Sequence, residues 1–365
     1  MRSLEEQRPC PGLSVPVVTV LDEAGRLLEA DQRALCRWVI QEGWGADVVF
    51  AAGTTGEWDR VDNATRQRVI QVCAEEVGKV NAGLGPGAGR PVECWAGITS
   101  HERGEVLENL EFAVEHGADA AVLAPLSIPD LDDPVRFVSR DLADRLDRCR
   151  RRIPLYLYDN ADIAADPRVP HIRTRQVKAL SRLDFVHGIK VTARRKVLGD
   201  YMKAARAFGE RGAFGIYVGN AHLIFHIFRP RRGPLAPVSN AYQRWRLRGG
   251  LPVGVVAGPA NVLPREWARA WQICRAGDAE RMDAVEQVLD AWRAATKASG
   301  ASLACTKHAL RTLGVVGSAA VAPGTLALSS DQAARFDEAF AAVRTLAAER
   351  IAAPWLSCAL GRGPA

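Results

Sequence analysis

Three short segments carry residues that could together perform covalent chemistry. In chain order they are Gly53-Thr54-Thr55-Gly56-Glu57, Leu157-Tyr158-Asp159-Asn160 and Gly188-Ile189-Lys190-Val191-Thr192. They offer backbone N–H groups and hydroxyls for an anion, then a phenol, then an amine. A lysine in an otherwise apolar strand is costly to bury as an ammonium, so its position calls for a chemical reason.

Lys190 is the candidate nucleophile. Alternate residues of a strand share a face, so Val186, Gly188 and Lys190 point the same way, and Gly188 leaves room beside that face. Burial lowers the pKa of a lysine and leaves a free amine, which can attack a keto carbon and form an imine. The other interpretation is a lysine that extends from a strand end into solvent. The strand alone does not separate the two, and the other two segments favour the amine.

Tyr158 is the candidate proton carrier. It ends the preceding predicted strand and shares a face with Tyr156. A phenol beside an imine nitrogen can relay protons while bonds form and break. Most buried tyrosines only fill a core, so the prediction depends on the neighbouring amine.

The loop after the second predicted strand could bind a carboxylate. Gly53 and Gly56 let the backbone bend tightly, and consecutive N–H groups join the hydroxyls of Thr54 and Thr55. Glycine-threonine turns are common in proteins, so this loop indicates an anion site only together with the phenol and the amine that follow it. We expect Glu57 to support the loop rather than to touch a ligand.

Eight β-rich runs alternate with amphipathic helices. The runs are Ser14–Leu21, Ala46–Ala52, Val92–Ile98, Ala118–Ala124, Ile153–Tyr158, Phe185–Thr192, Ala213–Val218 and Val253–Ala257. This alternation predicts an α/β fold, either a (β/α)8 TIM barrel or a doubly wound sheet. The barrel is favoured because the polar segments all fall at carboxyl ends of strands, where barrel sites are built.

The chain divides into four expected regions. They are an N-terminal arm (1–11), the barrel (12–264), a C-terminal helical extension (265–353) and a loose tail (354–365). We expect helices at Arg265–Ala276, Ala279–Ser299 and Ser330–Ala352 in the extension. An insertion at about 229–250 is rich in Arg, Pro and Gly and is expected to be irregular. It could form a lid or a subunit contact, or it could have no role.

Composition narrows the class of protein. The 365 residues carry a net charge of +6, without the aromatic-interleaved basic patch of a nucleic-acid binder, so we expect acidic small molecules rather than nucleic acid as partners. The eight cysteines are dispersed without a CxxC pair, and no signal or membrane-spanning segment is evident. We therefore expect a cytoplasmic protein that does not bind a membrane. The seven histidines suggest no metal site.

On these three segments the chain resembles the dihydrodipicolinate synthase / N-acetylneuraminate lyase family of class I aldolases, over about Gly12 to Trp292. The resemblance implies a barrel with a helical extension, an imine on Lys190 and proton relay by Tyr158. It implies that Thr54 and Thr55, with Gly53 and Gly56, hold a keto-acid carboxylate. It also places Ala257, at the end of the eighth strand, where the family leaves room for substrate. Gly219 and Asn220, at the end of the seventh strand, are further candidates for substrate contact from their position in this sequence. The resemblance implies a homodimer or homotetramer, and it implies no cofactor.

The departures from this family are also informative. Members that make dihydrodipicolinate carry paired tyrosines after strand four, one of which reaches the neighbouring subunit, and an arginine after the strand-five tyrosine. Here the two places read Ala124-Pro125-Leu126-Ser127 and Asp162-Ile163-Ala164, and the usual Tyr-Asn-x-Pro turn reads Tyr158-Asp159-Asn160-Ala161. Side chains at other strand ends could take over the lost contacts, or could equally cap helices; they are Asp159, Asn160, Arg194, Arg195, Asn220 and His222.

The sequence therefore predicts a lyase or synthase that acts on pyruvate or a related 2-keto acid, and on an aldehyde, through a Lys190 Schiff base. Aldol cleavage or condensation is expected, with dehydration or decarboxylation as variants, and dihydrodipicolinate synthesis is not. The alternative is a non-catalytic keto-acid-binding or scaffold protein on the same barrel. A barrel enzyme for phosphate substrates is disfavoured, because no glycine-rich phosphate loop stands out near the last two strands.

Overall fold

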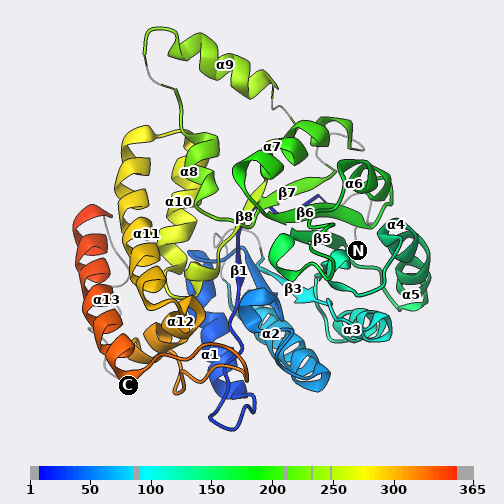
Figure 1. The fold of residues 1–365 in the computed structure, drawn as a ribbon, viewed down its shortest axis with the longest axis horizontal. Coiled ribbons are helices and arrows are strands. Elements are labelled where there is room, and N and C mark those ends of the chain that lie inside the picture. Colours follow the sequence, from blue (N-terminus) through cyan, green and yellow to red (C-terminus); the bar gives the residue numbers. More distant parts are fainter. Residues whose placement is uncertain (1–7, 85–90, 209–212, 232, 247–248, 352–365) are drawn as a thin grey trace.

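Eight parallel strands close into a barrel in sequence order (Figure 1). The computed structural model describes residues 8–84, 91–208, 213–231, 233–246 and 249–351. The strands are β1 (Gly12–Pro16), β2 (Val48–Ala51), β3 (Glu93–Gly97), β4 (Ala120–Leu123), β5 (Leu155–Asn160), β6 (Val186–Thr192), β7 (Gly215–Val218) and β8 (Gly254–Val256). The predicted (β/α)8 barrel is confirmed.

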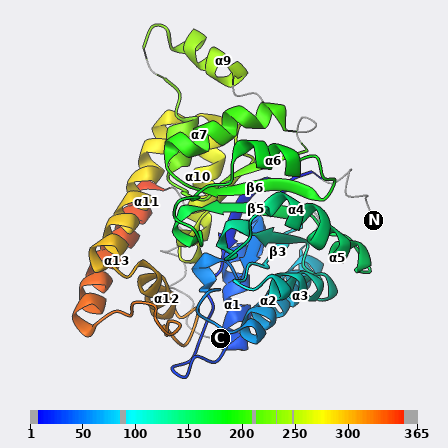
Figure 2. The ribbon, with the colours of Figure 1, turned by 45° about the vertical axis from the view of Figure 1, so that its right-hand side comes forward.

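Helices cover the outside of the strands (Figures 1 and 2). They are α1 (Glu29–Ile40), α2 (Asn63–Gly83), α3 (Arg103–Glu115), α4 (Pro134–Arg136), α5 (Ala143–Arg148), α6 (Thr174–Leu180), α7 (Arg195–Ala204), α8 (Leu223–Phe228) and α10 (Pro264–Ala276). The strands are buried on both faces, which explains their nearly continuous apolar sequences. No helix in the described part of the chain is long and apolar enough to cross a membrane.

The first strand is shorter than expected. The apolar run was predicted to form a strand to Leu21, but β1 ends at Pro16. The residues beyond it leave the sheet, and Leu21 instead forms antiparallel bridges with Leu27 and Ala320. The run is apolar because it is buried beneath later segments of the chain, not because it belongs to the barrel.

Aromatic side chains fill the barrel below its mouth. Trp95 stacks on Tyr156 with ring centroids 4.0 Å apart, and Tyr217 meets both rings edge-on, at 5.0 and 5.4 Å. Glycine makes room for them, since a Cβ on Gly254 would lie 2.6 Å from the ring of Tyr217. The barrel is therefore a packed core with an open end, as in other folds of this type.

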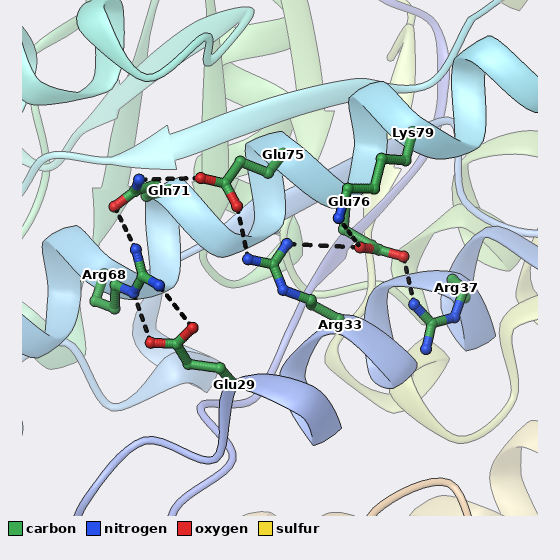
Figure 3. Close-up of polar contacts among 8 residues, drawn as sticks. All are labelled: Glu29, Arg33, Arg37, Arg68, Gln71, Glu75, Glu76 and Lys79. Carbon is green, nitrogen blue, oxygen red and sulfur yellow. Dashed lines mark hydrogen bonds and ion pairs between the residues drawn. The ribbon is translucent and has the colours of Figure 1, made fainter.

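α1 and α2 are joined at the surface by a chain of polar contacts (Figure 3). Its members are Glu29, Arg33, Arg37, Arg68, Gln71, Glu75, Glu76 and Lys79. Arg33, for example, lies 2.6 Å from Glu75 and 3.6 Å from Glu76. Single exposed ion pairs contribute little, so this network acts as a whole to hold two neighbouring helices in register.

The C-terminal extension consists of α11 (Ala279–Ser299), α12 (Ser302–Thr312) and α13 (Ser330–Arg350). Trp292 of α11 packs edge-on against Phe336 and Phe340 of α13. α12 was not predicted from the sequence. α10 contacts β1, α1 and α8 as the eighth barrel helix would, so we propose that the barrel runs through α10 and the extension begins at Ala279. The expected tail lies outside the described residues.

The insertion contains a helix, α9 (Ala236–Arg246), so the expectation of an irregular 229–250 segment is wrong over these residues. Proline at the second helical position is compatible with a helix start, and no glycine or proline follows it within the helix. Figures 1 and 2 show α9 standing away from the barrel, above α7 and α8. Four large apolar side chains on or beside it are exposed: Leu235, Val238, Tyr242 and Trp245.

Candidate active site

Lys190 lies inside the barrel, opposite Tyr158 in the β5–β6 register. Its side chain is buried, and its Nζ lies 3.7 Å from the ring centroid of Tyr158 and 5.1 Å from that of Phe50. Aromatic faces attract a cation without removing a proton or forming an ion pair. Within the described part of the chain, Lys190 forms no ion pair with a carboxylate. The amine is therefore buried, lies over two aromatic rings, and has no carboxylate counter-ion among the described residues.

The hydroxyl of Tyr158 is the meeting point of three polar side chains. Asn160 donates to it from Nδ2 at 3.1 Å, Thr192 donates from Oγ1 at 3.4 Å, and Thr54 Oγ1 lies 3.3 Å away. Burial raises the pKa of Tyr158, but the positive charge of Lys190 and the hydrogen bonds from Thr192 and Thr54 outweigh it, so the pKa is lowered. A phenol that gives up its proton more readily is better suited to proton transfer.

The Gly53–Gly56 loop leads directly from β2 into the mouth. Thr54–Gly56 form one tight turn, in which Gly56 and Glu57 donate their N–H groups to Gly53 and Thr54. The N–H groups of Thr54 and Thr55 precede these bonds and are not used by the turn itself. Both glycines are closely packed, because a Cβ would lie 2.9 Å from the Phe50 ring at Gly53, which would have to shift, and 3.1 Å from the Val17 carbonyl at Gly56.

Glu57 is held by the C-terminal extension. Its Oε2 lies 2.5 Å from the Nζ of Lys307 in α12, and both side chains are 2% exposed. Its Oε1 accepts hydrogen bonds from the backbone N–H of Ala322 at 2.8 Å and from the hydroxyl of Thr325 at 2.7 Å. Burial lowers the pKa of Lys307, and Glu57 partly offsets this effect. The extension therefore fixes the residue that follows the Gly53–Gly56 loop, which is the supporting position expected for Glu57.

The remaining predicted site residues are spread more widely. Gly219 lies beside the group, because a Cβ there would collide with Thr192 Oγ1. Thr55 turns toward the end of β8, where a Cβ on Gly258 would lie 3.3 Å from its hydroxyl. Asn220 is exposed where the chain enters α8. The side chain of Ala257 does not reach Lys190 and Tyr158, because it is buried between the strands and the outer helices. The residue before it, Val256, faces the barrel interior instead.

Among the side chains considered as replacements, only Asn160 reaches the phenol. Asp159 is buried and accepts hydrogen bonds from the Ile172 N–H at 2.8 Å and His171 Nδ1 at 2.9 Å. His222 packs edge-on against Trp267, where burial lowers its pKa to about 4. Thr192 was missed as a partner of Tyr158, although its spacing of two residues from Lys190 on one strand predicts the same face.

The position of the absent strand-four tyrosines is occupied by a short turn, Pro125–Ser127. The carbonyl of Ser127 contacts Nδ1 of His101 at 3.0 Å, and the His101 ring lies 5.0 Å from that of Trp58. No phenol comes from this chain at that point. In the described residues, no group of three or more His, Cys, Asp or Glu side chains is arranged to hold a metal ion.

Comparison with known proteins gives partial sequence matches. The sequence profile of the Dihydrodipicolinate synthetase family matches residues 9–89. The 4-hydroxy-tetrahydrodipicolinate synthase of Syntrophotalea carbinolica is 34% identical over 112 residues, which are 31% of this chain and 34% of that protein. The enzyme of the same name from Erythrobacter litoralis is 34% identical over 109 residues, 30% of this chain and 33% of that one. The chain spans about a third of the length of the curated relatives it matches.

Solved structures match over nearly the whole chain. Dihydrodipicolinate synthase from Bacteroides thetaiotaomicron superposes with a TM-score of 0.73 at 20% identity, covering 92% of this chain and 99% of that one. YagE from E. coli K12, a prophage protein of the dihydrodipicolinic acid synthase family in complex with pyruvate, gives 0.71 at 18%, with 92% and 98% covered. CdNal from Clostridium difficile with mannosamine gives 0.72 at 15%, with 92% and 99% covered. At these identities the likeness shows the fold.

Proposed function

We propose that the chain belongs to the dihydrodipicolinate synthetase family and is a class I aldolase that forms a Schiff base between Lys190 and pyruvate or a related 2-keto acid. The observation that carries the proposal is the position of Lys190, whose buried amine lies 3.7 Å from the ring centroid of Tyr158. An amine held without a carboxylate partner can lose its proton and attack a carbonyl.

The substrate carboxylate binds in the Gly53–Gly56 loop. The N–H groups and hydroxyls of Thr54 and Thr55 are the donors, and the close packing of both glycines keeps the backbone in this shape. The contact between Thr54 and the phenol at 3.3 Å connects the anion site to the proton carrier. The keto carbon then lies between the loop and the amine.

Lys190 attacks this carbon as the C–N bond forms, and Tyr158 relays a proton from the amine to the carbonyl oxygen, which gives a carbinolamine. The hydroxyl then leaves as water with a proton from Tyr158, which leaves a protonated imine and a phenolate. In cleavage the phenolate takes the proton of the substrate hydroxyl, the C–C bond breaks, its electron pair passes to the imine, and an aldehyde and an enamine form. Condensation is the reverse sequence. Asn160 and Thr192 are positioning residues, since they act by holding the hydroxyl of Tyr158.

The second substrate differs from that of dihydrodipicolinate synthases. The curated relatives are 4-hydroxy-tetrahydrodipicolinate synthases, but this chain has neither the paired tyrosines after β4 nor the arginine after Tyr158. We therefore propose a lyase or synthase with another aldehyde partner. By likeness to the family, we propose a homodimer or homotetramer.

A non-catalytic keto-acid-binding protein is the second candidate, and the Ala124–Ser127 segment without a phenol is the observation that favours it. Proton exchange separates the two. An enamine exchanges the methyl hydrogens of pyruvate with D2O, which proton NMR follows directly. We expect exchange with the wild type and with Lys178→Ala, a change of an exposed lysine on α6, and none with Lys190→Ala. Binding of pyruvate without exchange would support the non-catalytic candidate.

A further inference from the structure

A second cavity lies outside the barrel, between α7, α8 and the insertion that carries α9. Its volume is about 520 Å³, within the range of sites for small organic ligands. Figures 1 and 2 show that α9 stands above α7 and α8 at this place. Lys190 faces the interior of the barrel, whereas this cavity opens among the helices on its outer side, so the two are separate sites.

The walls of the cavity are strongly basic. Its basic lining residues are Arg195, Lys196, Lys203, Arg231 and His226, and no carboxylate is among the described residues that line it. Within the described part of the chain, Arg195, Lys196 and Arg231 form no ion pair, and Lys203 lies 3.4 Å from Asp200. Burial is the main cause that lowers the pKa of His226, and the nearby charges of Arg195 and Arg229 lower it further.

The rest of the lining is apolar or aromatic. Leu198 and Met202 of α7 are buried at its base, Ile227 of α8 forms part of the wall, and Tyr242 of α9 presents a half-exposed ring. Cations held together without counter-charges repel one another, and that cost falls when an anion binds between them. An aromatic ring beside them offers a surface for stacking.

We propose that this cavity is a second ligand site, which takes an organic phosphate with an aromatic body, of the nucleotide class. The phosphates lie against Arg195, Lys196 and Arg231, where charge-assisted hydrogen bonds are strongest. The aromatic part lies against Tyr242. Arg195 follows Lys190 by five residues, so one short segment at the end of β6 connects this site to the proposed nucleophile.

Isothermal titration calorimetry on the full chain tests the proposal with ATP, pyrophosphate and adenosine. We expect one ATP to bind per chain, and each half-ligand to bind at least about tenfold more weakly, because each keeps only part of the contacts. Arg195→Glu and Arg231→Glu, on opposite walls, should each lower ATP affinity at least about tenfold. Tyr242→Ala should weaken ATP and leave pyrophosphate unchanged.

Two controls make the result specific. Arg269→Glu makes the same charge change on the exposed side of α10, away from the cavity, and should leave ATP affinity unchanged. Lys190→Ala should also bind ATP normally, which separates this site from the proposed active site. Absence of ATP binding, an equal loss in Arg269→Glu, or competition between ATP and pyruvate would overturn the proposal.

Discussion

Two lysines are buried in this protein, and their surroundings differ. Lys307 in the extension lies 2.5 Å from the carboxylate of Glu57 and also donates to the carbonyl of Ala320 at 2.8 Å. Lys190 in the barrel lies over the rings of Tyr158 and Phe50. A lysine paired with a buried carboxylate acts as a structural clamp, whereas one beside a phenol and without a carboxylate is available as a nucleophile.

Both lysines lie near the Gly53–Gly56 loop, but each has a different relation to it. Lys307 fixes Glu57, which directly follows Thr54-Thr55-Gly56, and Lys190 lies in the mouth that this loop borders. Removing Lys190 should therefore abolish the reaction without unfolding the protein, whereas removing Lys307 should destabilise the fold and weaken substrate binding without removing the nucleophile.

Lys190→Ala should have the largest effect on activity. Without the amine no imine can form, so we expect turnover to fall by at least about 10⁴-fold. The variant removes no ion pair that the described residues show, so its thermal unfolding should stay close to that of the wild type. Steady-state turnover and circular dichroism measure the two properties, and retained turnover would contradict the assignment.

Lys307→Met should have the largest effect on stability. It leaves the carboxyl group of Glu57 in the interior without its cationic partner, which costs about 3–5 kcal/mol of unfolding free energy. Urea unfolding measures this loss, and the KM for pyruvate should rise because the loop loses its anchor. Adding Glu57→Gln should recover part of the stability, since the amide oxygen can still accept from Ala322 and Thr325.

A matched control exists on the surface. Arg281 and Asp278 form an ion pair at 3.5 Å with side chains 66% and 37% exposed, so Arg281→Met should cost less than about 1 kcal/mol. An equal cost for Lys307→Met and Arg281→Met would remove the distinction between a clamp and an ordinary surface pair.

Two tyrosines on the same face of β5 sharpen the comparison further. Tyr158→Phe should lower kcat by about 10²–10³-fold, because it removes the proton carrier while keeping the ring beside Lys190. Tyr156→Phe should leave kcat near the wild-type value, since that phenol lies in the aromatic floor, where burial raises its pKa well above the usual range. Similar losses of kcat in both variants would contradict a specific role for Tyr158.

Two buried glutamates allow a similar comparison. Glu266 is as buried as Glu57, but its Oε1 has no hydrogen-bond partner among the described residues. Burial raises its pKa from 4.5 to about 7, against smaller opposing effects of the backbone and Arg265. The folded state therefore favours the protonated form, and stability falls as pH rises from 4.5 to 7. At about 1.4 kcal/mol per pH unit, the loss reaches at most about 3 kcal/mol.

Glu266→Gln removes this titration. We expect the variant to be more stable than the wild type above pH 7, and to approach it below pH 4.5. Urea unfolding at pH 5 and pH 8 measures the difference. A stability gain that is the same at both pH values would show that the carboxylate does not titrate in this range.

The sequence predicted correctly those positions that depend on short stretches of chain, such as the residues at strand ends. Lys190, Tyr158 and Thr54 each stand at a fixed position relative to one strand end, and the alternation of a strand then places them on the interior face. The barrel itself follows from the eightfold alternation of elements. Ala257 was placed by likeness rather than by this alternation, and its phase directs the side chain outward.

The sequence was uninformative where distant segments meet. Glu57 and Lys307 are 250 positions apart, and no local pattern indicates that they pair. The helix that carries Lys307 was not expected, because polar residues interrupt its apolar face. The fold of α9 was hidden by the arginine, proline and glycine residues before it.

Borohydride trapping would detect an imine on Lys190 itself. The protein is incubated with pyruvate, reduced with sodium borohydride, and its intact mass and modified peptide are determined. We expect one pyruvate-derived adduct per chain, on Lys190, and none on Lys307, although both lysines are buried. An adduct on another lysine, or no adduct with pyruvate and with larger 2-keto acids on the folded protein, would contradict the Schiff-base proposal.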